Sequence, residues 1–199
     1  MTIIASTAII HPNVRLGENV VIEDYCVIGL PFKDMNNEET VIGDNSIIRA
    51  GTYIYAGNFI GKNFQTGNKA NIRELNRIGE NVSIGTLSVI EHHVSISNNV
   101  RIHSQVFVPE HTTLDEGCWL GPNVVITNAR YPKHPSAKNE LHGAHVMKNA
   151  KIGANSTLLP GVVVGINSLV GAGSLVTKDI ADGVIALGHP AKTQRKIDY

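Results

Sequence analysis

Four residues with proton-transfer or hydrogen-bonding side chains recur at intervals of 18 positions: Glu74, His92, Glu110 and Asn128. A carboxylate or an imidazole can take a proton from a reacting group that lies within hydrogen-bond reach. The amide of Asn128 can donate hydrogen bonds and accept them. If the fold brings these residues together, they are suited to binding a polar group and moving its proton. We therefore predict Asn128, His92 and Glu74 as catalytic residues.

Charged neighbours accompany this set with the same spacing. Arg73 and Glu91 are also 18 positions apart, and an arginine can bind a phosphate group through two parallel hydrogen bonds. Arg73 could instead form a salt bridge to Glu91. Because Glu74 and His92 are one interval apart, we expect the carboxylate to orient the imidazole and raise its pKa. Each histidine could equally be a solvated turn residue.

A hexad repeat is the element that must position these residues. From Ile42 in steps of six to Ile126, fourteen of fifteen residues are aliphatic, and Thr66 is the exception. Four positions after each comes a second, mostly smaller residue. Neither a helical period of 3.6 nor a strand period of two keeps this register, whereas short strands separated by regular corners do. The sequence therefore predicts an all-β solenoid.

The repeat extends over most of the chain as one predicted domain, residues 1–199. It starts at Ile4 and resumes from Val146 to Val176, with predicted loops at 30–41 and 132–145 and a C-terminal extension at 181–199. In that extension we expect a turn, a short strand and one helical turn. With three hexads per coil, residues 18 apart stack at about 4.8 Å. The four polar residues then form a ladder on one edge, and the loop at 132–145 leaves from the same column.

Bulk composition excludes several classes of partner. The chain has 17 basic and 17 acidic residues, so no basic surface for nucleic acid is expected. The N-terminal segment has neither the charged start of a signal peptide nor an apolar run long enough for a membrane span. Cys26 and Cys118 both fall on the small inward position of a hexad. We read them as unpaired core residues in the reducing cytoplasm.

Three motifs carry a resemblance to a known family: Ile72 to Glu74, Gly121 to Asn128, and Gly188 to Lys192. The hexad register resembles the left-handed parallel β-helix of the hexapeptide-repeat acyltransferases. The motifs are similar in order and spacing to those of N-acetyltransferases that act on nucleotide-linked 3-amino or 4-amino deoxysugars. The left-handed twist of the coil is implied by this resemblance alone, since parallel crossovers are generally right-handed.

The resemblance implies an acetyl-CoA-dependent enzyme without a metal, which forms homotrimers with active sites between neighbouring subunits. The expected acceptor is the amine of a dTDP- or UDP-linked sugar, used for cell-surface glycans such as lipopolysaccharide O-antigen. Asn128, with Glu74 or His92, would handle the amine. The predicted substrate-binding residues are Arg73, Glu91, Tyr131 and His134.

The resumed coils carry the residues predicted to bind coenzyme A. Small residues there would let backbone N–H groups approach the pantetheine chain, and lysines would meet its phosphates. Pro190 and Lys192 belong to the third motif. The predicted residues are Gly153, Ala154, Gly171, Ala172, Lys178, Pro190 and Lys192.

Other functions stay open on the sequence. Many hexapeptide-repeat transferases place a catalytic His-Pro where this chain has Tyr131-Pro132, and some amino-sugar members have histidines at Asn68-Lys69. A hydroxyl acceptor or an acyl-carrier-protein donor is therefore an alternative, and the loop at 30–41 resembles one in carrier-dependent enzymes. A γ-class carbonic anhydrase would need two histidines five residues apart, which the sequence lacks. A scaffold or ice-binding solenoid would have a uniform face, unlike the charged ladder.

Overall fold

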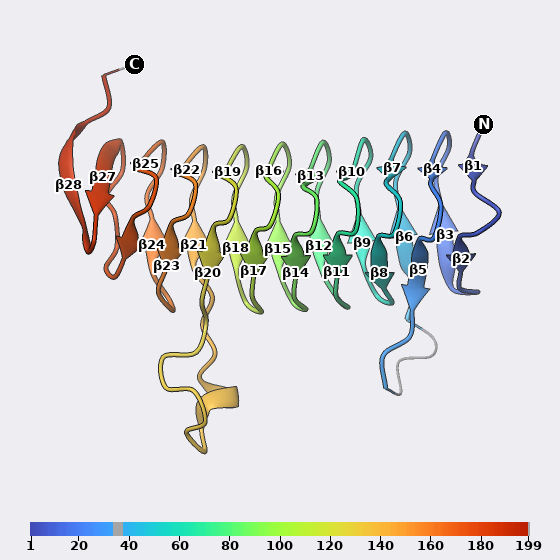
Figure 1. Cartoon of the computed structure of the whole chain (residues 1–199), viewed down its shortest axis with the longest axis horizontal. Coiled ribbons are helices and arrows are strands. Elements are labelled where there is room, and N and C mark those ends of the chain that lie inside the picture. Colours follow the sequence, from blue (N-terminus) through green and yellow to red (C-terminus); the bar gives the residue numbers. More distant parts are fainter. Residues whose placement is uncertain (34–37, 199) are drawn as a thin grey trace.

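The computed structural model describes residues 1–33 and 38–198 and shows an all-β solenoid of about ten coils (Figure 1). The three strands of a coil belong to three separate parallel sheets, which hold eleven, nine and eight strands. The described residues contain no α-helix and one 3₁₀ helix, η1 (Ala137–Asn139). This architecture confirms the predicted fold class and is consistent with a left-handed β-helix.

The strands are short, and each sheet takes every third one. The first sheet contains β1 (Ile3–Ile4), β4 (Val21–Ile22), β7 (Ile47–Ile48), β10 (Gln65–Thr66), β13 (Ser83–Ile84), β16 (Arg101–Ile102), β19 (Trp119–Leu120), β22 (Lys151–Ile152), β25 (Leu169–Val170), β27 (Val184–Gly188) and β28 (Ala191–Lys196). The second sheet contains β2 (Ile9–Ile10), β5 (Val27–Leu30), β8 (Tyr53–Tyr55), β11 (Asn71–Ile72), β14 (Val89–Ile90), β17 (Phe107–Val108), β20 (Val125–Ile126), β23 (Thr157–Leu158) and β26 (Leu175–Val176). The third sheet contains β3 (Val14–Leu16), β6 (Thr40–Ile42), β9 (Phe59–Ile60), β12 (Arg77–Ile78), β15 (Ser95–Ile96), β18 (Thr113–Leu114), β21 (His145–Val146) and β24 (Val163–Val164).

The hexad residues form one continuous core along the solenoid axis. Ile72, Ile90 and Ile126 are fully buried, whereas Ile4 in the first coil is 45% exposed because no coil covers it. Burying one such side chain contributes roughly 1.5–3 kcal/mol. Cys26 and Cys118 are buried and unpaired as predicted, and burial raises the pKa of the Cys118 thiol to about 12.

The predicted register is confirmed in the second sheet. Ile72 pairs with Ile90, and Ile90 pairs in turn with Val108. The turns that follow these strands therefore stack on one another. The ladder from Glu74 to Asn128 lies along a single edge of the solenoid.

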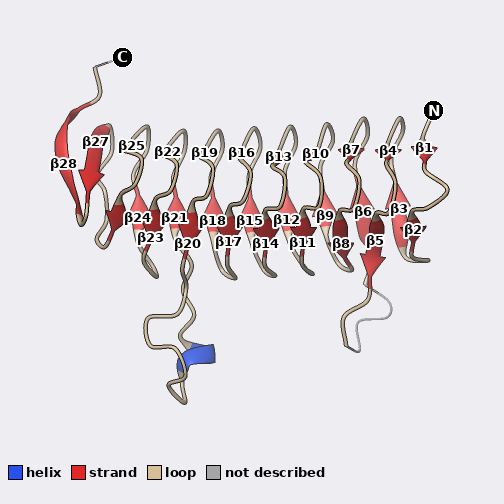
Figure 2. Ribbon diagram, viewed as in Figure 1, coloured by secondary structure: helices blue, strands red, loops and turns tan. Residues whose placement is uncertain are grey.

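Two loops project from this same edge, after β5 and after β20 (Figure 2). The first loop covers 31–39, and positions 34–37 of the predicted loop lie outside the described residues. The second loop covers 127–144 and includes η1. It ends one residue earlier than predicted, because His145 pairs with Thr113 in the third sheet.

The C-terminal extension differs from the prediction. β27 and β28 form an antiparallel hairpin that adds to the first sheet, where a short strand and a helical turn were expected. Residue 199 lies outside the described residues. The hairpin forms because β27 can continue the parallel ladder on β25, and β28 then pairs with its free edge.

Candidate active site

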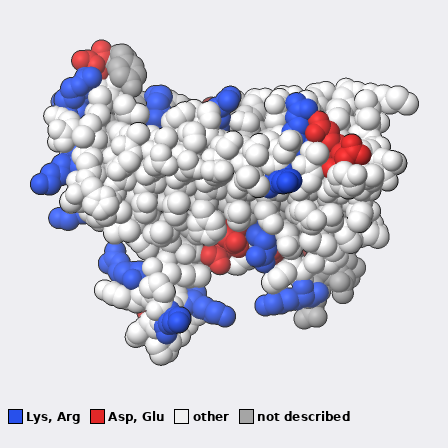
Figure 3. All heavy atoms as spheres, in the orientation of Figure 1, with Lys and Arg blue, Asp and Glu red and all other residues white. Residues whose placement is uncertain are grey.

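The turns after β11, β14, β17 and β20 form a surface that we call the charged corner, residues 73–76, 91–94, 109–112 and 127–128. It lies between the two loops. Figure 3 shows acidic and basic atoms at this edge and basic side chains on the projecting loops. The ladder predicted from the sequence is therefore assembled within one chain.

The backbone of the charged corner takes a left-handed conformation at one residue in each of its first three turns. The φ angles are 62° at Leu75, 55° at His93 and 62° at His111. The matching turns after the third sheet carry Asn81, Asn99 and Gly117 at this position. The left-handed region costs roughly 1–2 kcal/mol for an L-residue other than glycine or asparagine. The fold alone therefore does not favour these side chains.

Arg73 donates three hydrogen bonds to the carboxylates of Glu74 and Glu91. Its Nε and Nη2 donate to Glu74 at 2.9 and 3.1 Å, and its Nη1 donates to Glu91 at 3.4 Å. Burial tends to lower the pKa of Arg73, but the hydrogen bond and charge of Glu74, with the charge of Glu91, leave it raised. Glu74 is only 4% exposed. Arg73 thus makes the predicted pair with Glu91 and also neutralises a buried carboxylate.

His92 does not pair with Glu74 as expected. Its Nε2 lies 3.2 Å from Glu110 Oε1, and its Nδ1 lies 2.7 Å from His93 Nδ1. The reason is that the Glu74 side chain binds Arg73, its neighbour in the sequence. Glu110, one coil further along, therefore supplies the carboxylate for His92. Because a carboxylate only accepts, His92 Nε2 carries the proton, and in the neutral pair His92 Nδ1 accepts from His93. Both ring nitrogens of His92 are therefore engaged.

His93 is the imidazole of this pair that keeps a nitrogen available. Within residues 1–33 and 38–198, no group hydrogen-bonds to its Nε2. Partial burial lowers the pKa of His93, and the nearby His92 and His111 lower it further. The ring of His111 lies 6.0 Å from that of His93. The free basic nitrogen of the corner is thus on His93, a residue absent from the predicted set.

Glu110 connects the histidines to Asn128. Asn128 Nδ2 donates to Glu110 Oε2 at 2.5 Å, so one carboxylate holds both His92 and Asn128. In the described part of the chain, nothing donates to Asn128 Oδ1. This oxygen is available to accept a hydrogen bond from a ligand. The sequence placed Glu110 on the ladder but did not identify its bridging role.

The predicted residues of the second loop do not contact the ladder in the single chain. Tyr131 is 65% exposed. It lines a hollow of about 260 Å³ together with Arg130, Glu140, His142, Pro160 and Gly161. His134 bonds within the loop, with Nδ1 2.8 Å from Ser136 Oγ. Tyr131 therefore faces a hollow between the loop and the turn at Pro160 and Gly161, whereas His134 bonds within the loop.

Two aromatic residues that the sequence reasoning missed close the other end of the charged corner. The guanidinium carbon of Arg73 lies 4.7 Å from the ring centre of Phe32 and 5.0 Å from that of Tyr55. Tyr55 precedes Arg73 by 18 positions, so the repeat could have revealed its place under the ladder. Phe32 lies on the first loop, outside the repeat, and no sequence signal marks it.

Two glycines predicted to bind coenzyme A, Gly153 and Gly171, use their N–H groups in the sheet ladder. The N–H of Gly153 donates to Val170 O at 2.8 Å, and that of Gly171 donates to Ala186 O at 2.8 Å. A Cβ on Gly153 would lie 2.4 Å from the backbone N of Ala172. These positions are glycine because consecutive coils approach closely there.

The other predicted coenzyme A residues lie on the surface of the last coils and the C-terminal hairpin. Ala154 is half-buried, and the remaining four are at least partly exposed. Pro190 follows a cis peptide bond to His189. These four residues are Ala172, Lys178, Pro190 and Lys192.

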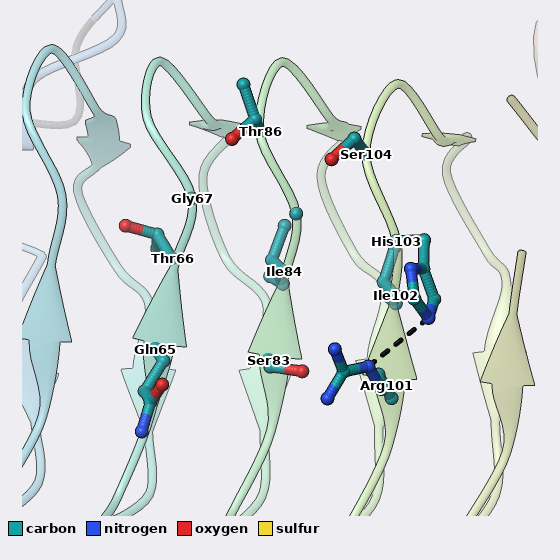
Figure 4. A pocket seen from close by; sticks show the side chains of 11 residues that line it. Gln65, Thr66, Gly67, Ser83, Ile84, Thr86, Arg101, Ile102, His103 and Ser104 are labelled. Atoms are coloured by element: carbon teal, nitrogen blue, oxygen red, sulfur yellow. Dashed lines mark hydrogen bonds between the residues drawn. The ribbon is translucent and has the colours of Figure 1, made fainter. Parts of the chain in front are cut away.

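A separate hollow of about 240 Å³ lies on the first sheet (Figure 4). Arg101 Nε donates to His103 Nε2 at 3.2 Å, and the ring of His103 packs 4.8 Å from Trp119. Burial and the charge of Arg101 lower the pKa of His103. The lining includes none of the predicted site residues, and it consists of Gln65, Thr66, Gly67, Ser83, Ile84, Gly85, Thr86, Arg101, Ile102, His103 and Ser104.

One group in the charged corner has the spacing of a metal site. Ligand atoms of Glu91, His92 and Glu110 all lie within 4.8 Å of one another. However, Arg73 already binds Glu91, and Asn128 already binds Glu110. A cation would have to displace both of these hydrogen bonds.

Family models match two parts of the chain. The bacterial transferase hexapeptide model matches residues 143–178, and the hexapeptide repeat of succinyl-transferase matches 40–56. Together with the coiled fold, these matches support the hexapeptide-repeat transferase family for this chain. No helix in the described ranges is long and apolar enough to cross a bilayer.

Two curated relatives match part of the chain. The galactoside O-acetyltransferase of Lactococcus lactis is 41% identical over 101 residues, 48% of this chain and 45% of the relative. That of Escherichia coli is 34% identical over 90 residues, 43% of this chain and 44% of the relative. The chain thus spans less than half the length of the curated relatives it matches.

Among solved structures, LpxA of Bacteroides fragilis, a UDP-N-acetylglucosamine acyltransferase, superposes with a TM-score of 0.64 at 23% identity, covering 96% of this chain and 74% of its own. A variant of AntD of Bacillus cereus, an N-acyltransferase in complex with dTDP-4-amino-4,6-dideoxyglucose and coenzyme A, superposes at 0.60 and 21% identity, covering 70% and 84%. At these identities the likeness concerns the fold.

Proposed function

We propose that this chain transfers an acetyl group from acetyl-CoA to the amine of a nucleotide-activated 3-amino or 4-amino deoxysugar. The observation that carries the proposal is the charged corner. Its carboxylates suit an amine that is protonated in water. Asn128 Oδ1, which has no donor among the described residues, can accept a hydrogen bond from the same amine. The galactoside O-acetyltransferases and AntD support an acyltransferase activity.

The reaction requires the loss of two protons from an ammonium group. In the proposed mechanism the ammonium binds to Asn128 Oδ1 and to Glu110, which accepts its first proton. The neutral amine attacks the thioester carbonyl, the C–N bond forms, and the C–S bond breaks. The second proton leaves with the departing thiolate as the CoA thiol.

His92 holds Glu110 in place through its Nε2–H. Arg73 holds the Glu74 carboxylate beside the site through two hydrogen bonds. In this scheme Glu110 is the proton acceptor, and His92 and Glu74 position the groups around it. The Glu110 carboxylate is the best placed for that role because it lies between His92 and Asn128.

The rest of the assembly follows from the same proposal. Acetyl-CoA would lie along the last coils near Ala154, Ala172 and Lys178, with its phosphates near Lys192 and the Pro190 turn. Tyr131 and His134 would meet the acceptor once the site is completed between neighbouring subunits of a homotrimer. We place the reaction in the cytoplasm, in the synthesis of cell-surface glycans such as lipopolysaccharide O-antigen, without a metal.

A second candidate is acetylation of a sugar hydroxyl. The observation that favours it is the identity of 41% over 101 residues to a galactoside O-acetyltransferase. A hydroxyl is a much weaker base than an amine and needs a general base to attack. His93, with a free Nε2, is the group in the charged corner that suits this role.

The test measures release of the CoA thiol from acetyl-CoA with a panel of acceptors. The panel contains dTDP- and UDP-linked 3-amino and 4-amino sugars, the matching sugars with a hydroxyl in place of the amine, and simple galactosides. Turnover only with amino sugars supports the proposal. Turnover only with hydroxyl acceptors would replace it with the second candidate, and turnover with neither would remove both.

A further inference from the structure

The acceptor site has a second wall, formed by Phe32 and Lys33 at the start of the first loop. β5 and β20 belong to the same sheet, with β8, β11, β14 and β17 between them. At about 4.8 Å per strand spacing, the bases of the two loops are about 24 Å apart. Figure 1 shows both loops on the same side of the solenoid. The charged corner is thus the floor of a valley that is bounded at both ends.

The first loop is fastened to this floor by aromatic contacts. Phe32 and Tyr55 pack edge to face, with ring centres 6.5 Å apart at 68°. Arg73 lies against both rings, and its guanidinium is fixed by Glu74 and Glu91. Lys33 Nζ lies 5.1 Å from the centre of the Phe32 ring. Both rings are partly exposed, so a flat ligand can reach them from the valley.

Charge is distributed unevenly along the valley. On the floor, the single guanidinium of Arg73 is matched by Glu74 and Glu91, and Glu110 adds a further negative charge. Lys33 on the first loop is exposed and has no carboxylate partner among the described residues. A phosphate group would be repelled from the floor and attracted to this lysine. An amine would have the opposite preference.

The length of the floor can be compared with the length of the acceptor. From Arg73 to Asn128 there are three strand spacings, about 14 Å in total, so a diphosphate that follows the hexose would lie at the Arg73 end of the floor, beside Lys33. An acceptor whose amine lies at Asn128 would therefore reach the first loop with its nucleotide.

We propose that Phe32, Lys33 and Tyr55 form a binding site for the nucleoside diphosphate of the acceptor. The base stacks on the Phe32 ring and contacts the Tyr55 ring, which is inclined at 68° to it, with its edge, and Lys33 binds the diphosphate. This inference rests on the proposed function for its choice of ligand. It assigns nucleotide binding to three residues that the sequence pattern did not select. Two of them, Phe32 and Lys33, lie at the start of the first loop.

The test uses UDP and dTDP, which have no sugar and cannot be acetylated, with binding measured by titration calorimetry on the full chain. Phe32→Leu keeps an apolar side chain but removes the ring, and we expect about tenfold weaker binding, as for removal of a base-stacking aromatic. Lys33→Ala removes an exposed charge that the fold does not need, and we expect a similar loss. Lys133→Ala, on the second loop, is the matched control and should bind normally.

The outcomes separate this inference from the proposed reaction. Binding that depends on Phe32 and Lys33, without acetylation of any amino sugar, would keep the nucleotide site and remove the reaction. Acetylation with unchanged nucleotide affinity and KM in Phe32→Leu and Lys33→Ala would keep the reaction and overturn the site. Loss of affinity in Lys133→Ala alone would assign the diphosphate to the second loop, and no measurable binding of either nucleotide would also overturn the inference.

Discussion

The charged corner and the corner after the third sheet have the same hexad backbone but very different side chains. In the latter, which we call the asparagine corner, left-handed residues are mostly asparagines, among them Asn63, Asn81 and Asn99. Their side chains bond along the stack, with Nδ2 to Oδ1 distances of 2.8 Å from Asn63 to Asn81 and 3.1 Å from Asn81 to Asn99. Asparagine tolerates this backbone and adds a hydrogen bond per coil.

The charged corner has neither advantage. His93 and His111 take the left-handed conformation without forming such a ladder, and Glu74 is buried and ionic. Lys69, Leu87 and Gln105 take the same conformation in the turns after the first sheet, so the backbone alone does not single out the charged corner. Its difference from the asparagine corner is the buried Glu74 and the paired histidines, and the following experiments test that difference.

The largest difference is expected at the buried ion pair. Arg73→Met leaves the carboxylate of Glu74 without its partner and should lower the free energy of unfolding by about 3–5 kcal/mol. In the asparagine corner, Lys62 and Glu80 are 3.4 Å apart with side chains 52% and 46% exposed, so Lys62→Met should cost at most about 1 kcal/mol. Urea denaturation measures both.

A double variant checks the cause of that loss. Arg73→Met combined with Glu74→Met removes both charges, so most of the lost stability should return. If the double variant were as unstable as the single one, the unpaired charge would not be the reason.

The next difference concerns turnover. Asn128→Ala removes the amide oxygen that accepts from the proposed amine and should lower kcat/KM about 100-fold, as for removal of one hydrogen-bonding group that stabilises a transition state in other enzymes. Asn81→Ala in the asparagine corner should leave kcat/KM unchanged. Full turnover in Asn128→Ala would remove this residue from the site.

A smaller effect is expected when the charged corner is converted toward the asparagine corner. His93→Asn with His111→Asn places two asparagines 18 positions apart, as Asn63 and Asn81 are, and should form a similar side-chain hydrogen bond. We expect a gain of about 1 kcal/mol in unfolding free energy together with a loss of turnover, since His92 loses its partner. The reverse change, Asn81→His with Asn99→His, should lower stability. Unchanged stability in both would show that the two corners do not differ in this respect.

The smallest effect is on pH dependence. The pKa of His93 is lowered from its usual 6.5, so the unfolded chain takes up a proton before the folded chain does. Stability should therefore decrease as the pH falls below about 6.5. The pKa of His103 is lowered as well. The effect of His93→Asn is therefore measured in a protein that already carries His103→Asn, from the urea midpoint at each pH. Without His93, the stability should decrease less as the pH falls.

The asparagine corner should respond in a different pH range. The hydrogen bond and charge of Lys148 lower the pKa of Glu116 from its usual 4.5. Its contribution is present above that value and is lost as the pH falls below it. A Glu116→Gln variant that altered the slope between pH 7 and 5.5 would contradict this assignment.

The sequence was sufficient for the fold and for the location of the charged corner. The step of six determines which residues face inward, and the step of 18 determines which residues stack, because each coil contacts only its two neighbours. Glu74, His92 and Asn128 could therefore be placed on one edge with the second loop beside them. Even Tyr55 was within reach of the same argument.

The tertiary structure alone decided how these side chains pair. Arg73 turns toward Glu74, so His92 bonds to Glu110 instead, and this choice depends on side-chain rotamers that no spacing specifies. The N–H groups of Gly153 and Gly171 are consumed by the coils above them, which only the observed coil contacts reveal. Phe32 reaches Arg73 through a loop outside the repeat. Periodic contacts are encoded locally and repeatedly, whereas the contact between Phe32 and Arg73 occurs once and depends on the path of the first loop.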